Sequence, residues 1–62
     1  MQNSVREQAV RLISENLGQL TAKSYEKFYL DKNDELIKAS VFELLTEVLG
    51  EKKAQEKIAV LK

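Results

Sequence analysis

The sequence predicts a small all-α protein, a compact bundle of three to four helices over about residues 5–17, 22–30, 34–49 and 52–61. Three observations lead to this prediction. Proline is absent from the 62 residues and glycine occurs only twice. Apolar side chains recur at the three- and four-residue spacing of helices. A composition with 44% hydrophobic and 32% charged residues is typical of a folded domain and not of a disordered chain. Residues 1–62 are expected to form a single helical domain.

The first helix is predicted over residues 5–17. Ser4 is a favourable N-cap, and Glu7 three residues later completes a capping box. Gly18 suits the residue that ends a helix. Asn16 projects near the middle of the apolar face and has two interpretations. We favour an Asn that is solvated or caps a carbonyl in the last turn. The alternative is a buried Asn that fixes register across a helical interface.

The second helix is predicted over residues 22–30, with Thr21 as its N-cap. Its aromatic residues, Tyr25, Phe28 and Tyr29, lie on one side together with Ala22. An aromatic cluster at helical spacing usually belongs to the core. Tyrosine is also enriched in protein interfaces, so a partner-binding patch is the alternative, and the two roles are compatible.

The third helix, over residues 34–49, is the most informative segment because it is apolar on two adjacent faces. Asp31 or Asn33 can cap its start, and Gly50 suits its end. One apolar line contains Ile37, Val41, Leu44 and Val48, and the second contains Phe42, Leu45 and Leu49. Two apolar faces predict either the central helix of the fold or a helix whose second face meets another chain.

A fourth helix is predicted over residues 52–61, with an inner face formed by Ala54, Ile58 and Leu61. The four helices are then joined by short turns, which makes helices that follow each other in sequence neighbours in space.

Composition narrows the range of functions. The chain has neither Cys nor His, so disulfides are impossible and the usual nitrogen and sulfur ligands of zinc are missing. The commonest catalytic base and the thiol nucleophile are missing too. We therefore expect no catalytic residues, no cofactor, no metal site and no enzymatic activity. A chain this short is marginally stable alone, and self-association is a remedy that its composition leaves available.

DNA binding is the alternative function. Residues 17–25 (LGQLTAKSY) have the outline of a helix-turn-helix, in which Lys23 and Lys27 face outward together. The stretch SYEKFYLDKNDELI resembles the end of the DNA-binding region of tetracycline-repressor-type regulators, where a Tyr, a Phe, a Lys and a Leu succeed one another before a long helix. In this chain the steps from Phe28 to Lys32 and from Lys32 to Leu36 are longer than in that family. The resemblance implies a DNA-binding regulator. The formal net charge of zero gives no general attraction for phosphates.

These observations lead us to predict a small protein–protein interaction domain with a regulatory or adaptor role, which forms a homodimer through the surface of the third helix. The predicted interface residues are Phe42, Leu45 and Leu49, followed by Tyr25 and Tyr29. Charged groups such as Glu47 and Lys38 would set partner choice. The absence of Cys agrees with a cytoplasmic location, and no apolar run is long enough to cross a membrane. Two alternatives stay open, a docking domain of a longer chain and a monomeric bundle.

Overall fold

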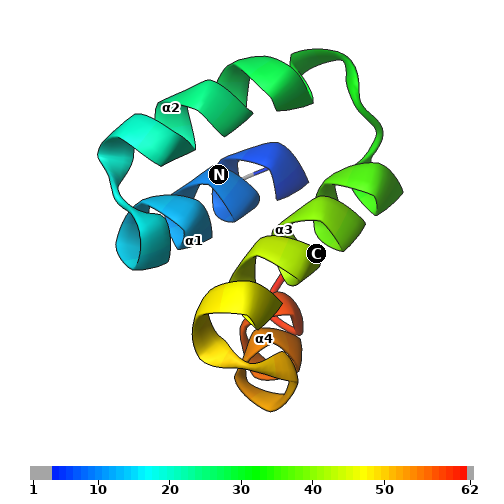
Figure 1. The fold of residues 1–62 in the computed structure, drawn as a ribbon. Coiled ribbons are helices and arrows are strands. Elements are labelled where there is room, and N and C mark those ends of the chain that lie inside the picture. Colours follow the sequence, from blue (N-terminus) through cyan, green and yellow to red (C-terminus); the bar gives the residue numbers. More distant parts are fainter. Residues whose placement is uncertain (1–3, 62) are drawn as a thin grey trace.

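The computed structural model describes residues 4–61, which form helices and turns without any β-strand (Figure 1). The α-helices are α1 (Val5–Leu17), α2 (Gln19–Phe28), α3 (Asp34–Leu49) and α4 (Glu51–Ile58), and a short 3-10 helix, η1 (Tyr29–Asp31), follows α2 directly. The predicted all-α bundle is therefore confirmed.

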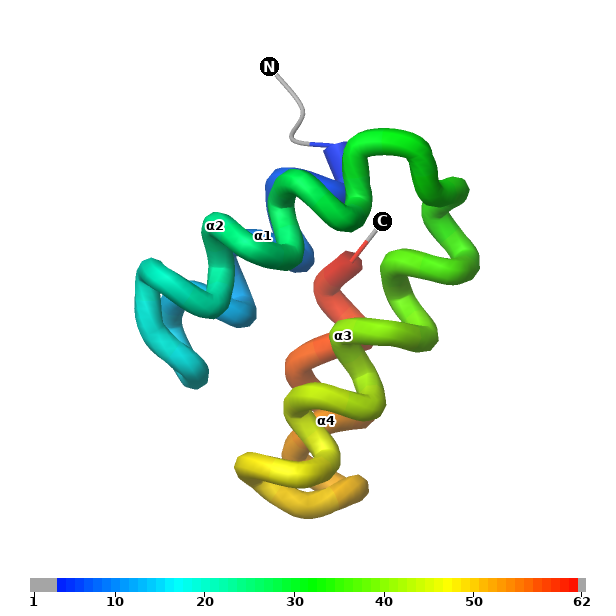
Figure 2. Tube along the Cα trace, turned by 45° about the horizontal axis from the view of Figure 1, so that its top comes forward, coloured from blue at the N-terminus to red at the C-terminus, as the bar shows by residue number. Residues whose placement is uncertain are grey.

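The four helices form two hairpins that pack against each other. In each hairpin a single glycine joins the two helices, Gly18 between α1 and α2 and Gly50 between α3 and α4. The glycines have φ angles of 98° and 91°, which residues other than glycine rarely adopt. The hairpins meet mainly where α1 packs on α3. In Figure 2, α2 lies in front of α1 and α3 lies in front of α4, and α2 and α3 diverge from η1.

The predicted bounds of α1 and α3 are confirmed because local capping residues define both helices. The Ser4 hydroxyl accepts a hydrogen bond from the backbone N–H of Glu7 at 3.1 Å, and the Glu7 carboxylate accepts one from the N–H of Ser4 at 3.1 Å. At the start of α3, the Asn33 side chain accepts from the N–H of Leu36 at 2.8 Å, which selects Asn33 over Asp31 as the N-cap.

The bounds of α2 and α4 differ from the prediction. Gly18 ends α1 and is at the same time the N-cap residue of α2, so α2 begins at residue 19 and Thr21 lies inside its first turn. Gly50 has the same double role, and α4 begins at residue 51. Helix α4 also ends earlier than predicted, at Ile58, and the chain turns so that Leu61 is buried.

The core contains apolar side chains from all four helices and from η1: Val5, Ala9, Leu12, Ile13, Ala22, Tyr29, Ile37, Val41, Leu45, Ala54 and Leu61. Helix α3 packs against both α1 and α4, so it is the central helix. This position accounts for both of its apolar faces within one chain.

Asn16 adopts the favoured of its two interpretations. Its side-chain amide donates a hydrogen bond to the backbone carbonyl of Leu12 at 2.8 Å, one turn earlier in α1. The amide therefore bonds to a backbone carbonyl of its own helix and does not fix register against a neighbouring helix.

Candidate protein-interaction surface

The structure places two of the predicted interface residues in the core. The side chains of Leu45 and Tyr29 have no solvent-exposed surface. In this fold neither can contact a second chain, so the assignment of these two residues to an interface is corrected. The reason is that α3 is covered on both apolar faces, by α1 and by α4.

The other three predicted interface residues, Phe42, Leu49 and Tyr25, are half-buried and pack against the core. Each keeps some surface at the edge of the bundle. Val48 shows the opposite deviation: it belongs to the apolar line of Val41, yet 47% of its surface is exposed. The end of α3 is thus less completely covered than its middle.

Among residues 4–61, four of the six large apolar residues that are exposed lie in the segment from α2 to the start of α3, and the other two are Val48 and Val60. The exposed fractions are 84% for Leu20, 50% for Phe28, 63% for Leu30 and 45% for Leu36. Sequence reasoning missed this set because Leu20 falls between the predicted helices 5–17 and 22–30, and Phe28 belongs to an aromatic cluster interpreted mainly as core. With α2 starting at residue 19, Leu20 lies on the side of α2 opposite the buried Ala22.

Phe28 is held at the surface by its neighbours. Its ring lies 6.3 Å from that of Tyr25 in an edge-on arrangement and 5.7 Å from that of Tyr29, measured between ring centroids. The ammonium of Lys32 lies 4.7 Å from the Phe28 centroid, within the range of a cation–π contact. Ser24, Tyr25 and Phe28 line a surface hollow of about 410 Å³. Phe28 and Tyr25 therefore form an ordered apolar surface that a partner could contact.

Exposed charged side chains accompany these apolar residues, mainly lysines on α2 and glutamates on α3; the exposed Glu26 of α2 lines the α1–α2 groove together with Lys23. Lys23 and Lys27 are exposed on α2, and Glu35, Glu43 and Glu47 are exposed on α3. Across residues 4–61 the only ion pair joins Lys32 to Asp31, at 2.9 Å. We call the exposed apolar residues Leu20, Phe28, Leu30 and Leu36 together with these five charged residues the α2–α3 surface.

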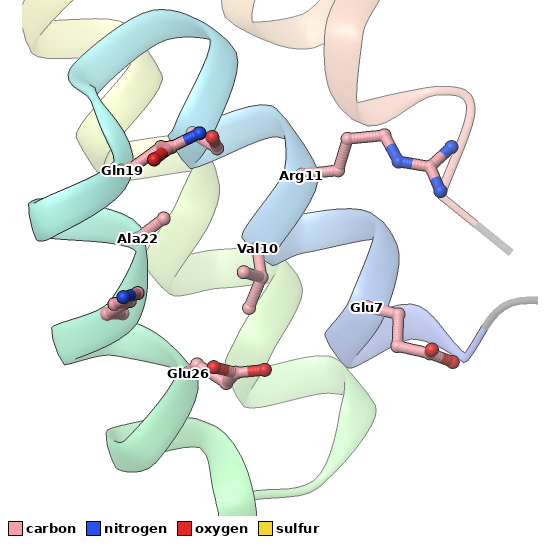
Figure 3. Close-up of a pocket in the computed structure, with 8 residues that line it drawn as sticks. Glu7, Val10, Arg11, Gln19, Ala22 and Glu26 are labelled. Atoms are coloured by element: carbon pink, nitrogen blue, oxygen red, sulfur yellow. The ribbon is translucent and has the colours of Figure 1, made fainter.

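A second surface feature is the groove between α1 and α2, with a volume of about 480 Å³ (Figure 3). Val10 points into it, whereas Glu7 and Arg11 extend away from α2. The Glu7 carboxylate is already engaged in the capping box of α1. A catalytic or ligand-binding site requires polar groups that converge on one point. Around this groove, acidic and basic groups are mixed and do not converge.

Among residues 4–61, three side chains have shifted pKa values, and each shift has a structural cause. Burial raises the pKa of the Tyr29 hydroxyl, and its hydrogen bond to Ser40 opposes this rise. Hydrogen bonds from Ser4 lower the pKa of Glu7, and the hydrogen bond from Lys32 lowers that of Asp31. The Tyr29 hydroxyl is joined to α3 through Ser40, whereas Glu7 and Asp31 bond to residues at most three positions away in the sequence.

Within residues 4–61 no three Asp or Glu side chains gather closely enough to hold a metal ion. Over the same residues, no helix combines the length and the apolar character needed to cross a membrane. Comparisons with models of known protein families, with curated proteins and with solved structures found no match. Any functional assignment therefore has to be argued from the surface of this chain.

Proposed function

We propose that this chain is a protein–protein interaction domain that self-associates as a homodimer, in keeping with a regulatory or adaptor role. The contact is formed by the α2–α3 surface, with Tyr25 at its edge. Burial of apolar side chains drives the association at about 25 cal/mol per Å². The charged side chains around them determine which partner is accepted.

One observation carries this proposal. Four of the large exposed apolar residues lie in the short segment from Leu20 to Leu36. Concentrated apolar exposure of this kind marks interaction sites on folded proteins. A standard interface buries about 800 Å² per partner, which is less than a fifth of the 4534 Å² accessible surface of this chain.

The proposal is tested by the mass of the protein in solution, measured by light scattering over a concentration series. We expect a dimer that dissociates on dilution. The variant Leu20→Glu should shift this equilibrium toward the monomer, because the Leu20 side chain is almost fully exposed in a single chain. The control is Val60→Glu, which adds the same charge at an exposed apolar position near the C-terminus. A wild-type protein that is monomeric at every concentration would refute self-association.

DNA binding is the second candidate, favoured by the exposed Lys23 and Lys27 on α2. Helix α3, which carries the exposed Glu35, Glu43 and Glu47, lies on the same side of the molecule as α2 (Figure 2), and these carboxylates would repel phosphates. Titration of a labelled DNA duplex at low and high salt tests this candidate. Binding that weakens steeply with salt, and that is lost in Lys23→Glu with Lys27→Glu, would favour it over the homodimer.

The proposal includes no catalytic activity and no cofactor. Its support is the lack of Cys and His in the sequence and the scattered charges around the α1–α2 groove. A cytoplasmic location also belongs to the proposal and is supported by the lack of Cys.

A further inference from the structure

We infer that two copies of this chain pair unlike helices around a two-fold axis, so that α2 of each copy packs against α3 of the other. This inference rests on the proposed homodimer and specifies its geometry. It is carried by the distribution of charge and apolar side chains over the α2–α3 surface.

The charge distribution argues against pairing of like faces. Lys23 and Lys27 accompany Leu20 on the exposed side of α2. If α2 packed against α2 of a second copy, lysines would face lysines. Packing α3 against α3 would likewise bring Glu43 and Glu47 of both copies together. Like charges in close contact disfavour an interface.

Pairing α2 with α3 of the second copy brings opposite charges together. Leu36, Glu43 and Glu47 lie on the side of α3 away from the buried Val41. The two lysines and these two glutamates are both spaced four residues apart, about 6 Å along a helix. In an antiparallel alignment, residues at similar distances from η1 meet, which brings Lys23 of one copy close to Glu43 of the other, with Leu20 beside this contact.

The fold provides the symmetry that this pairing needs. Helix α2 runs toward η1 and α3 runs away from it, and the two helices lie on the same side of the molecule (Figure 2). A two-fold axis that passes between them near η1 places α2 of each copy on α3 of the other, in the antiparallel sense. The contact then occurs twice and the assembly closes at two copies.

The ionic groups are available for such a contact. Lys23, Lys27, Glu43 and Glu47 are all exposed, and none of them takes part in the one ion pair found among residues 4–61. Their substitution removes no side chain from the core, so the variants are expected to fold.

Complementary charge reversals test the inference. One variant carries Lys23→Glu and Lys27→Glu, so both of its faces are acidic. The other carries Glu43→Lys and Glu47→Lys, so both are basic. Each variant alone should self-associate at least about tenfold more weakly than the wild type, because like charges now face each other. Mixed in equal amounts, they should form a one-to-one dimer with at least the affinity of the wild type.

Two controls make this result specific. The variant Lys52→Glu with Lys53→Glu changes the net charge as much as the reversal of Lys23 and Lys27 does, but on α4. It should dimerise like the wild type. A single chain with all four reversals should dimerise again, since its two faces have only exchanged sign. Circular dichroism establishes that each variant is folded, and mass is measured by sedimentation equilibrium.

The outcomes separate the inference from the proposed function. If the wild type dimerises but the two reversed variants do so equally well, or fail to combine when mixed, the α2–α3 pairing is wrong while self-association stands. If the wild type is a monomer at all concentrations, both are wrong. A mixture that forms the dimer where each variant alone does not supports the pairing.

Discussion

The hydroxyl groups of Tyr29 and Ser40 lie 2.8 Å apart and form the hydrogen bond that ties η1 to the middle of α3. The ring of Tyr29 is fully buried, so water could not easily replace this partner. The bond fixes the position of the segment that connects the two hairpins, and with it the relative placement of α2 and α3.

Removal of this hydrogen bond should destabilise the fold. We expect Tyr29→Phe to lower the free energy of unfolding by about 1 kcal/mol, the typical net contribution of a buried hydrogen bond. Urea denaturation measures the change. Ser40→Ala and the double variant complete a double-mutant cycle. If the two single effects simply add, the hydroxyls are not coupled and the hydrogen bond has no energetic role.

Alkaline pH should weaken the fold through the same tyrosine. Because burial raises the pKa of Tyr29 above 10.0, the unfolded chain loses this proton at a lower pH than the folded chain. The stability that depends on neutral Tyr29 is present below about pH 10 and is lost as pH rises through the folded pKa. Unfolding free energies measured from pH 9 to pH 11 should therefore fall more steeply in the wild type than in Tyr29→Phe. Equal slopes would contradict this prediction.

The capping box of α1 should contribute to stability and should weaken in acid. We expect Ser4→Ala to lower the free energy of unfolding by about 1 kcal/mol at neutral pH, as is usual for loss of an N-cap. The pKa of Glu7 is lowered by its hydrogen bonds with Ser4, so its contribution is present above pH 4.5 and is lost as pH falls through the folded pKa. The difference between wild type and Glu7→Gln should accordingly shrink in acid. A difference that stayed constant down to pH 2 would disprove the role of the charge.

The backbone at Gly50 should reject L-residues for conformational reasons alone. A Cβ atom added there meets nothing within 4 Å, but the φ angle is 91°. We expect Gly50→Ala to cost about 1–3 kcal/mol, because φ 91° combined with ψ 158° is a conformation that almost only glycine adopts. A chemically synthesised chain with D-alanine at this position is the matched control, since a D-residue favours positive φ. It should be as stable as the wild type or more so, and equal destabilisation by both residues would point to a steric cause instead.

Truncation of leucine to alanine should affect stability at one position and dimer formation at another. Leu45→Ala empties part of the core and should cost about 2–5 kcal/mol of unfolding free energy. Leu20→Ala removes the same atoms from an exposed position and should leave the stability of the dilute monomer within about 0.5 kcal/mol of the wild type, while weakening dimer formation. Thermal unfolding at low concentration and sedimentation at high concentration measure the two effects separately. Loss of stability in Leu20→Ala would place this side chain in the core.

The helix bounds that the sequence predicts correctly are those set by local chemistry. Ser4 with Glu7, and Asn33 ahead of Asp34, bond to backbone groups within one turn, so no tertiary contact is needed to infer them. The start of α2 escapes such reasoning. Gly18 is both the C-cap of α1 and the N-cap of α2. The same residues are equally compatible with a longer turn between the two helices.

The sequence cannot separate core residues from interface residues, because burial in a core and burial in a dimer require the same apolar side chains. Leu45 and Leu49 belong to one apolar line of α3, yet only Leu45 is fully enclosed. The position of α4 over α3 decides this difference, and it depends on the crossing of two helices. Conversely, Leu20 falls between the first two predicted helices, and the start of α2 at Gln19 places it on the exposed side of that helix.

The arrangement in two glycine-linked hairpins has a kinetic consequence. Most packing in this chain joins helices that follow each other directly in sequence, and the contact of α1 with α3 is the main exception. Short separations between contacting residues make folding fast, on the order of microseconds to milliseconds for helical bundles. Each hairpin can close early and at little entropic cost, so the docking of α1 on α3 is the step expected to limit the folding rate. Substitutions that weaken the packing of α1 on α3 should then slow folding more than substitutions of equal cost inside either hairpin.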